Sequence, residues 1–169
     1  MIKAGEVNRI VAVNGIRSVV EFGCGDGYQL GMFSIPHYIG LDVSSNALRR
    51  CIKEEGSDPG KSFFKYDQSC WSDKLRVMHA DMALSMDVVF HLVEDEVFER
   101  YMTDLFAAGD RYVLIYSTDG PGAKREPRFT RHRNFTDWVT VHANGWRLSE
   151  RLENPAGTGA HLHLFTRDA

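Results

Sequence analysis

Short apolar runs alternate along this chain with segments in which apolar residues recur every three or four positions. The apolar runs predict buried strands, which fall at residues 17–23, 37–43, 62–67, 81–86 and 111–117. The periodic segments predict helices at 7–15, where Gly15 ends the helix, at 27–34, at 46–56 after Ser44 and Ser45, and at 93–109. In the last of these, Val93, Val97, Tyr101 and Leu105 share one face.

The last part of the chain has a different pattern. A long loop rich in Gly, Pro and Arg spans 118–135, and a short helix capped by Thr136 is expected at 136–145. Two alternating strands at 146–154 and 160–168 are joined by PAGTG, which indicates a hairpin. The order of elements predicts a doubly wound α/β fold, with a mostly parallel seven-stranded sheet that ends in an antiparallel C-terminal hairpin. We expect residues 1–169 to form a single domain.

Composition narrows the functional classes. A net charge of -3 gives no electrostatic argument for nucleic acid as a partner. The three cysteines are widely spaced and include no CxxC pair, so they are expected to be free thiols in a reducing compartment. No apolar run approaches the roughly 20 residues that a membrane span needs. We therefore expect a cytoplasmic protein with no membrane partner.

The stretch EFGCGDGY follows the first predicted strand and places glycines at 23, 25 and 27. A phosphate-binding loop of the Walker A type needs Lys and Ser or Thr after its last glycine, and Tyr28 and Gln29 stand there instead. A dinucleotide-binding turn needs its third glycine at position 28, which is Tyr28. Glycine at these positions lets the backbone approach a ligand closely.

The register of this turn, with Glu21 two residues before Gly23, resembles motif I (E/D-x-G-x-G-x-G) of class I S-adenosylmethionine-dependent methyltransferases. The resemblance extends from about residue 16 to 169. It implies that Glu21 takes the cofactor's ammonium directly or through water, that Asp42 accepts the ribose hydroxyls, and that Asp67 receives the adenine amino group. Further cofactor contacts are expected at Gly23, Cys24, Gly25, Val43, Gln68 and Ser85. As an alternative, Asp42 and Asp67 are ordinary caps of a following helix or turn.

Two residues at the fourth strand end are candidates for catalysis. Asp87 and His91 lie four positions apart, so both could share one helical face beside the expected sulfonium. Histidine has the intrinsic pKa of a general base near neutrality. The competing interpretation is that His91 packs beside the sheet and that Asp87 holds the methionyl end or caps a helix.

The segment REPRFTRHRNF gathers positive charge after the fifth strand. Guanidinium groups bind carboxylate or phosphate with two prongs, which indicates a clamp for an anionic substrate. The candidate substrate residues are Arg128, Arg131, His132, Arg133 and Asp119. A solvated basic loop is the alternative. No metal site is expected, because His161 and His163 have no third ligand near them in the sequence.

Together these features predict an enzyme that transfers a methyl group from S-adenosylmethionine to N or O of a small, anionic molecule, as a monomer or homodimer. One alternative is a scaffold protein that binds the cofactor without catalysis. Another is a nicotinamide-dependent oxidoreductase, against which Tyr28 argues.

Overall fold

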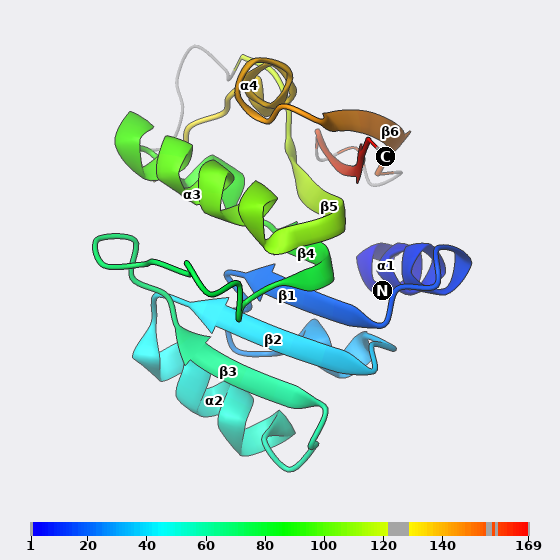
Figure 1. Ribbon diagram of the computed structural model, residues 1–169, viewed down its shortest axis with the longest axis vertical. Coiled ribbons are helices and arrows are strands. Elements are labelled where there is room, and N and C mark those ends of the chain that lie inside the picture. Colours follow the sequence, from blue (N-terminus) through cyan, green and yellow to red (C-terminus); the bar gives the residue numbers. More distant parts are fainter. Residues whose placement is uncertain (1, 122–128, 155–156, 158, 169) are drawn as a thin grey trace.

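The computed structural model describes residues 2–121, 129–154, 157 and 159–168. Its strands form one seven-stranded sheet in the order β3-β2-β1-β4-β5-β7-β6 (Figure 1). β1 to β5 pair in parallel, and β7 runs antiparallel to both β5 and β6. The strands are β1 (Ser18–Phe22), β2 (His37–Asp42), β3 (Lys61–Lys65), β4 (Ala80–Met86), β5 (Gly109–Thr118), β6 (Trp146–Leu152) and β7 (Ala160–Arg167). The predicted fold class is confirmed.

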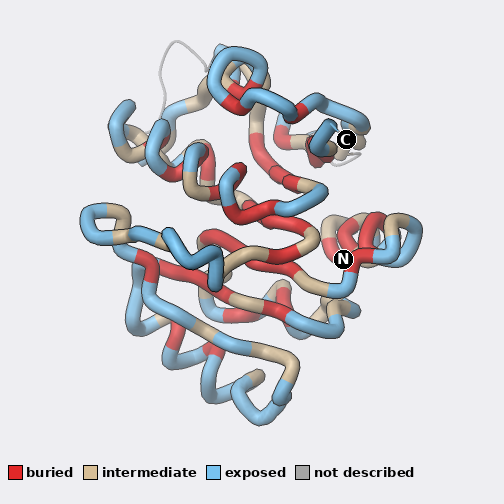
Figure 2. The backbone as a smooth tube through the Cα atoms, viewed as in Figure 1, coloured by how far each residue is buried: buried red, intermediate tan, exposed pale blue. Residues whose placement is uncertain are grey.

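Helices pack on both faces of this sheet. α1 (Ile2–Val13) buries Val7, Ile10 and Val11 in one apolar cluster, together with Val19 of β1. α3 (Asp95–Ala108) and α4 (Phe135–His142) belong to a second cluster that contains Val20. Since consecutive strand residues point to opposite faces, α1 lies on one side of the sheet and α3 and α4 on the other. Figure 2 shows the buried positions concentrated in the central strands and the inner sides of these helices.

The second helix, α2 (Ser45–Glu55), follows β2 and packs along β2 and β3. Its predicted cap is confirmed, because the Ser44 hydroxyl accepts a hydrogen bond from Ala47 N at 3.3 Å. Two short 3-10 turns complete the fold, η1 (Leu30–Met32) and η2 (Val89–His91). No helix in the described ranges is both long and apolar enough to cross a membrane.

Three local predictions need correction. The first helix begins at Ile2 and not at residue 7, and the expected helix at 27–34 is only the turn η1. α4 starts at Phe135 with Asn134 at its N-cap, so Thr136 lies inside the helix. The reason is that Asp119, after β5, accepts hydrogen bonds from Thr136 N at 3.2 Å and Thr136 Oγ1 at 2.6 Å. A distant carboxylate therefore satisfies the helix end that a local cap was expected to serve.

Candidate functional site

The glycine turn after β1 lies at the carboxyl edge of the parallel strands. Gly23, Gly25 and Gly27 have φ of 83°, 60° and 83°, in the left-handed region that side chains rarely adopt. A Cβ on Gly23 would stand 2.4 Å from Val88 Cγ2, whereas a Cβ on Gly25 would meet no protein atom within 4 Å. Gly23 is thus required by packing, and Gly25 presents bare backbone to open space.

Asp42, at the end of β2, is hydrogen-bonded to the glycine turn that follows the neighbouring strand β1. Its Oδ2 accepts a hydrogen bond from Gly25 N at 2.9 Å, and its Oδ1 accepts one from Ser44 N at 2.7 Å. The residue is 9% exposed. Each carboxylate oxygen has a second lone pair, so Asp42 can still accept from ligand hydroxyls while it shapes the turn.

Glu21 is turned away from the open space and into the protein. It is 3% exposed and accepts a hydrogen bond from the Tyr38 hydroxyl on β2. The pKa of Glu21 is raised to about 7, mainly by burial and also by the charges of Asp42 and Asp87, against the opposing effect of the Tyr38 hydrogen bond. The acid of the glycine motif therefore does not contact the cavity directly.

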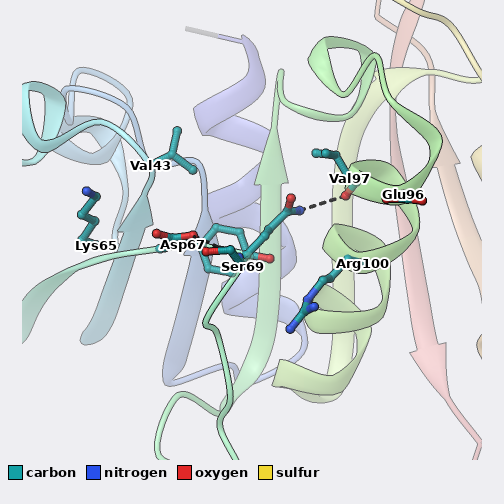
Figure 3. A pocket seen from close by; sticks show the side chains of 9 residues that line it. Val43, Lys65, Asp67, Ser69, Glu96, Val97 and Arg100 are labelled. Carbon is teal, nitrogen blue, oxygen red and sulfur yellow. Dashed lines mark hydrogen bonds between the residues drawn. The ribbon is translucent and has the colours of Figure 1, made fainter.

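Two adjoining cavities lie at this edge of the sheet. The smaller, of about 360 Å³, is lined by Gly23, Asp42 and residues from the β4–α3 connection. The larger, of about 610 Å³, lies between the β3 end and α3 (Figure 3). They share Val43, Tyr66, Gln68 and Val97 along their common border. Together they form a continuous hollow from the glycine turn to the end of β3.

The predicted contacts near β3 line this hollow in different ways. Asp67 lies in the larger cavity, where Ser69 N and Oγ donate to its Oδ1 at 3.0 and 2.7 Å. These bonds from Ser69 lower the pKa of Asp67. Gln68 borders both cavities and donates from Nε2 to Val97 O on α3 at 2.8 Å (Figure 3). Val43, 67% exposed, supplies an apolar surface on the opposite side.

Ser85 is not among the residues that line either cavity. Its hydroxyl lies 2.7 Å from the Tyr101 hydroxyl, and Tyr101 donates to Phe22 O at 2.9 Å. Tyr101 itself lines the smaller cavity. Ser85 therefore contacts the cavity only indirectly, through its hydrogen bond to Tyr101.

The thiol of Cys24 lies beside that of Cys51 from α2, and Cys51 Sγ contacts Gly25 O at 3.3 Å. Burial raises the pKa of both thiols, so they stay protonated near neutral pH. Cys24 packs beside Cys51 within the protein and does not line either cavity.

Asp87 and His91 both line the smaller cavity, but they do not share a helical face as their spacing predicted, because the 3-10 turn η2 begins only at Val89. Asp87 has a positive φ of 61° and pairs with Lys3 Nζ of α1 at 2.5 Å. His91, on η2, contacts Phe129 O through Nδ1 at 3.2 Å and packs against the ring of Phe90 at 4.6 Å.

The basic segment, residues 129–133, lies against the start of α3. Arg133 donates to Asp95, to Leu92 O at 3.1 Å and to Val93 O at 2.8 Å, and its guanidinium stacks 4.7 Å from the Phe98 ring centroid. Arg131 donates to Val93 O at 3.0 Å and pairs with Asp95 at 3.1 Å. Both guanidinium groups are therefore engaged within the protein.

The remaining substrate candidates are held in other ways. His132 Nδ1 contacts the Thr118 hydroxyl, and Asp119 holds the start of α4. Arg128 lies outside the described residues. Arg133 contacts Leu92, which lines the smaller cavity, but neither cavity is lined by Asp119, Arg131, His132 or Arg133.

Several residues at the site were missed by sequence reasoning. Lys3 and Gln29 approach Asp87 from the α1 side, at 2.5 and 3.5 Å. Gln29 Oε1 is buried and has no hydrogen-bond partner in the described part of the chain. Tyr66, Val88 and Leu92 add apolar walls. Among these residues, only Val88 could have been suggested by the sequence, because it directly follows Asp87. Lys3 and Gln29 lie 84 and 58 residues away from Asp87, so no local pattern connects them to it.

No protein-family model and no curated protein sequence matches this chain. Solved structures match over nearly its whole length. The methyltransferase domain of bacterial CtHen1-C has 21% identity and a TM-score of 0.74, covering 99% of this chain and 97% of its own. The N-methyltransferase NodS from Bradyrhizobium japonicum, in complex with S-adenosyl-L-homocysteine, has 14% identity and a TM-score of 0.74, covering 99% and 87%.

A third match has a sugar-modifying activity. CalS10, an amino pentose methyltransferase from Micromonospora echinaspora with bound S-adenosylmethionine, has 16% identity and a TM-score of 0.74, covering 98% and 90%. At these identities the likeness concerns the fold. The chain has the class I S-adenosylmethionine-dependent methyltransferase fold.

Proposed function

We propose that this chain is an S-adenosylmethionine-dependent methyltransferase that acts on N or O of a small, anionic molecule. The observation that carries the proposal is that Gly23 of the glycine turn and the Asp42 carboxylate line one cavity, while Asp42 also accepts a hydrogen bond from Gly25 N. All seven strands belong to one sheet, which supports a single methyltransferase domain over 1–169. The free thiols Cys24, Cys51 and Cys70 support a cytoplasmic location.

The residues present fit this cofactor. Asp42 has lone pairs for the ribose hydroxyls, and Val43 and Val97 offer apolar surface for a base, with Asp67 and Gln68 beside it. The unpartnered oxygen of Gln29 and the carboxylate of Asp87 suit a cationic group near the glycine turn. When bound, the cofactor supplies a methyl carbon activated by its sulfonium.

His91 is the proposed base. A backbone carbonyl can only accept, so the contact with Phe129 O favours the tautomer with hydrogen on Nδ1. In that tautomer Nε2 carries a lone pair and can remove a proton from a hydroxyl or ammonium acceptor at the cavity. Asp87 is proposed to orient the cofactor and not to take this proton, because its Oδ2 lies between Lys3 and Gln29 on the α1 side of the site.

The acceptor is proposed to be small and anionic because Arg133 donates to Leu92 O, and Leu92 lines the smaller cavity together with His91. Arg131 N donates to Phe90 O at 2.8 Å, which fixes the basic segment next to the proposed base. The guanidinium groups of Arg131 and Arg133 contribute charge at a distance and not a direct clamp, since each is bonded within the protein.

Thermal unfolding with added ligands tests the cofactor assignment. S-adenosylhomocysteine at a hundredfold excess over its Kd should raise Tm by about 5–10 °C, and NAD should cause no shift. Asp42→Ala should abolish the shift, whereas Glu54→Ala, which removes an exposed carboxylate on α2, should leave it intact. A shift with NAD alone would support the oxidoreductase alternative.

Turnover separates an enzyme from a cofactor-binding scaffold. A screen of small carboxylates and phosphates with radiolabelled methyl donor should identify an acceptor, and His91→Gln should then lower kcat by about a hundredfold with cofactor affinity kept. Normal kcat in His91→Gln would rule out the base assignment. Binding without any methyl transfer would favour the scaffold.

A further inference from the structure

The glycine motif predicts that its acid, Glu21, receives the cofactor's ammonium, but the structure does not place Glu21 in a position to do so. Its carboxylate is buried against the Tyr38 hydroxyl and does not line either cavity. The carboxylates that line the smaller cavity are Asp42, which already accepts from Gly25 N and Ser44 N, and Asp87, which accepts from no backbone N–H that the structure describes. A cationic ligand group at the glycine turn therefore meets Asp87 first.

A second acceptor lies beside Asp87. Gln29 Nε2 is 3.5 Å from Asp87 Oδ2, and Gln29 Oε1 is buried without a hydrogen-bond partner in the ranges that the structure describes. The amide orientation follows from this contact, because exchange of N and O would set two acceptors against each other. An unsatisfied buried oxygen is costly, and an incoming ammonium would satisfy it.

Lys3 places the opposite charge at the same point. Its Nζ lies 2.5 Å from Asp87 Oδ2 and 3.9 Å from the Tyr116 ring centroid. The Lys3 and Asp87 side chains are each 33% exposed, so water reaches both partners. A partly exposed ion pair of this kind contributes little to stability and can be opened by a competing ligand.

The amino-acid end of S-adenosylmethionine carries one ammonium and one carboxylate, a charge pattern complementary to an opened Lys3–Asp87 pair. We propose that this pair separates around the amino-acid end of the cofactor, with Asp87 and Gln29 accepting from its ammonium and Lys3 donating to its carboxylate. This inference rests on the proposed function. It makes α1 part of the cofactor site and Lys3 a specificity residue for ligands with an intact amino-acid end.

Two ligands that differ in this end provide the test. S-adenosylhomocysteine carries the amino acid, and 5′-methylthioadenosine has the same adenosine and sulfur without it. By isothermal titration, Lys3→Met should weaken S-adenosylhomocysteine about tenfold or more and leave 5′-methylthioadenosine within about twofold. Asp87→Asn should show the same selectivity.

Matched variants control for general effects. Arg9→Met removes another positive charge from α1, where Arg9 pairs with Glu6 and Glu150, and should change neither affinity. Lys3→Arg keeps the charge and should retain most of the S-adenosylhomocysteine affinity. Thermal unfolding without ligand checks that every variant is folded.

The outcomes distinguish the proposed role of Lys3 from the proposed function of the protein. Equal weakening of both ligands by Lys3→Met, or no weakening of either, overturns the role of Lys3 while the proposed function stands. Failure of the unmodified protein to bind S-adenosylhomocysteine at all overturns the proposed function and this inference with it.

Discussion

Near the glycine turn and in the basic segment, charged side chains contact residues that line the smaller cavity, but the two regions use these charges in opposite ways. At the glycine turn, Lys3 and Asp87 form one partly exposed pair, and Gln29 Oε1 lacks a partner in the described structure. In the basic segment, Arg133 has an 11% exposed side chain and is bonded to Asp95 and two backbone carbonyls. The first region keeps an acceptor, Gln29 Oε1, that a ligand can use. In the second, both terminal nitrogens of Arg133 are bonded within the protein, and only its Nε is buried without a partner among the described residues.

This difference shows that charge near a cavity is a poor guide to ligand binding until the partners are known. Arg131 and Arg133 cover the connection between η2 and α3, whose carbonyls at Leu92 and Val93 would otherwise lack a donor. Lys3, in contrast, contacts Asp87, a carboxylate that we propose also binds the ammonium of the cofactor. If the basic segment serves stability and the glycine turn serves binding, variants in the two regions should differ in their free energies of unfolding.

The largest effect is expected from Gly23→Ala. Its φ of 83° costs a side chain about 1–2 kcal/mol, and the clash 2.4 Å from Val88 Cγ2 adds about 1–3 kcal/mol. Urea unfolding should show a loss of about 4 kcal/mol, partly recovered in the Val88→Ala background, which removes the clashing methyl.

Gly25→Ala is the matched control, because its φ is 60° but nothing lies within 4 Å of the added Cβ. It should lose about 1 kcal/mol of stability. Equal losses for the two glycine variants would show that packing against Val88 does not shape the turn.

A pH-dependent effect is expected from Glu21→Gln. Burial raises the folded-state pKa of Glu21 from 4.5 to about 7, so folding binds its proton more tightly than the unfolded chain does. The stability that this proton contributes is present below pH 4.5 and lost as the pH rises through 7. The unmodified protein should therefore lose about 3 kcal/mol relative to Glu21→Gln between pH 5 and pH 8.

Urea unfolding at pH 5, 6.5 and 8 measures this divergence, and glutamine can still accept the Tyr38 hydrogen bond. Glu54→Gln, at an exposed position on α2, should follow the unmodified protein at every pH. Parallel curves for Glu21→Gln and the unmodified protein would mean that Glu21 is ionised at little cost.

The smallest effects compare the two regions directly. Arg133→Met should lower the free energy of unfolding by about 2 kcal/mol, because it leaves Leu92 O without its charged donor and Val93 O with Arg131 alone. Lys3→Met should lower it by less than about 1 kcal/mol, since the Lys3–Asp87 pair is partly exposed. A larger loss in Lys3→Met than in Arg133→Met would reverse the comparison.

The sheet and its carboxyl edge could be predicted from the sequence because both depend on local patterns. Apolar runs locate the strands, and the ends of parallel strands necessarily meet at one edge, which places Asp42 near the glycine turn. Asp87 and His91 reach the same cavity for the same reason.

The orientation and partners of charged groups could not be predicted in this way. Glu21 turns toward Tyr38 because strand alternation points it to the α1 face, where a phenol on the neighbouring strand is available. Lys3 meets Asp87 across 84 residues, and Arg133 meets the carbonyl of Leu92 across 41. Such pairs depend on how helices are placed on the sheet, which no local pattern records.

The position of β7 between β5 and β6 has a consequence for the synthesis of the chain. The β5 edge that β7 covers stays unpaired in a growing chain until residues 160–167 have left the ribosome. α1 is made before the strands of the sheet, yet its cluster contains Leu162 and Leu164 of β7, so it completes its contacts only then. Until that moment the strongly apolar β5 presents an open strand edge, the kind of surface that chaperones protect from aggregation.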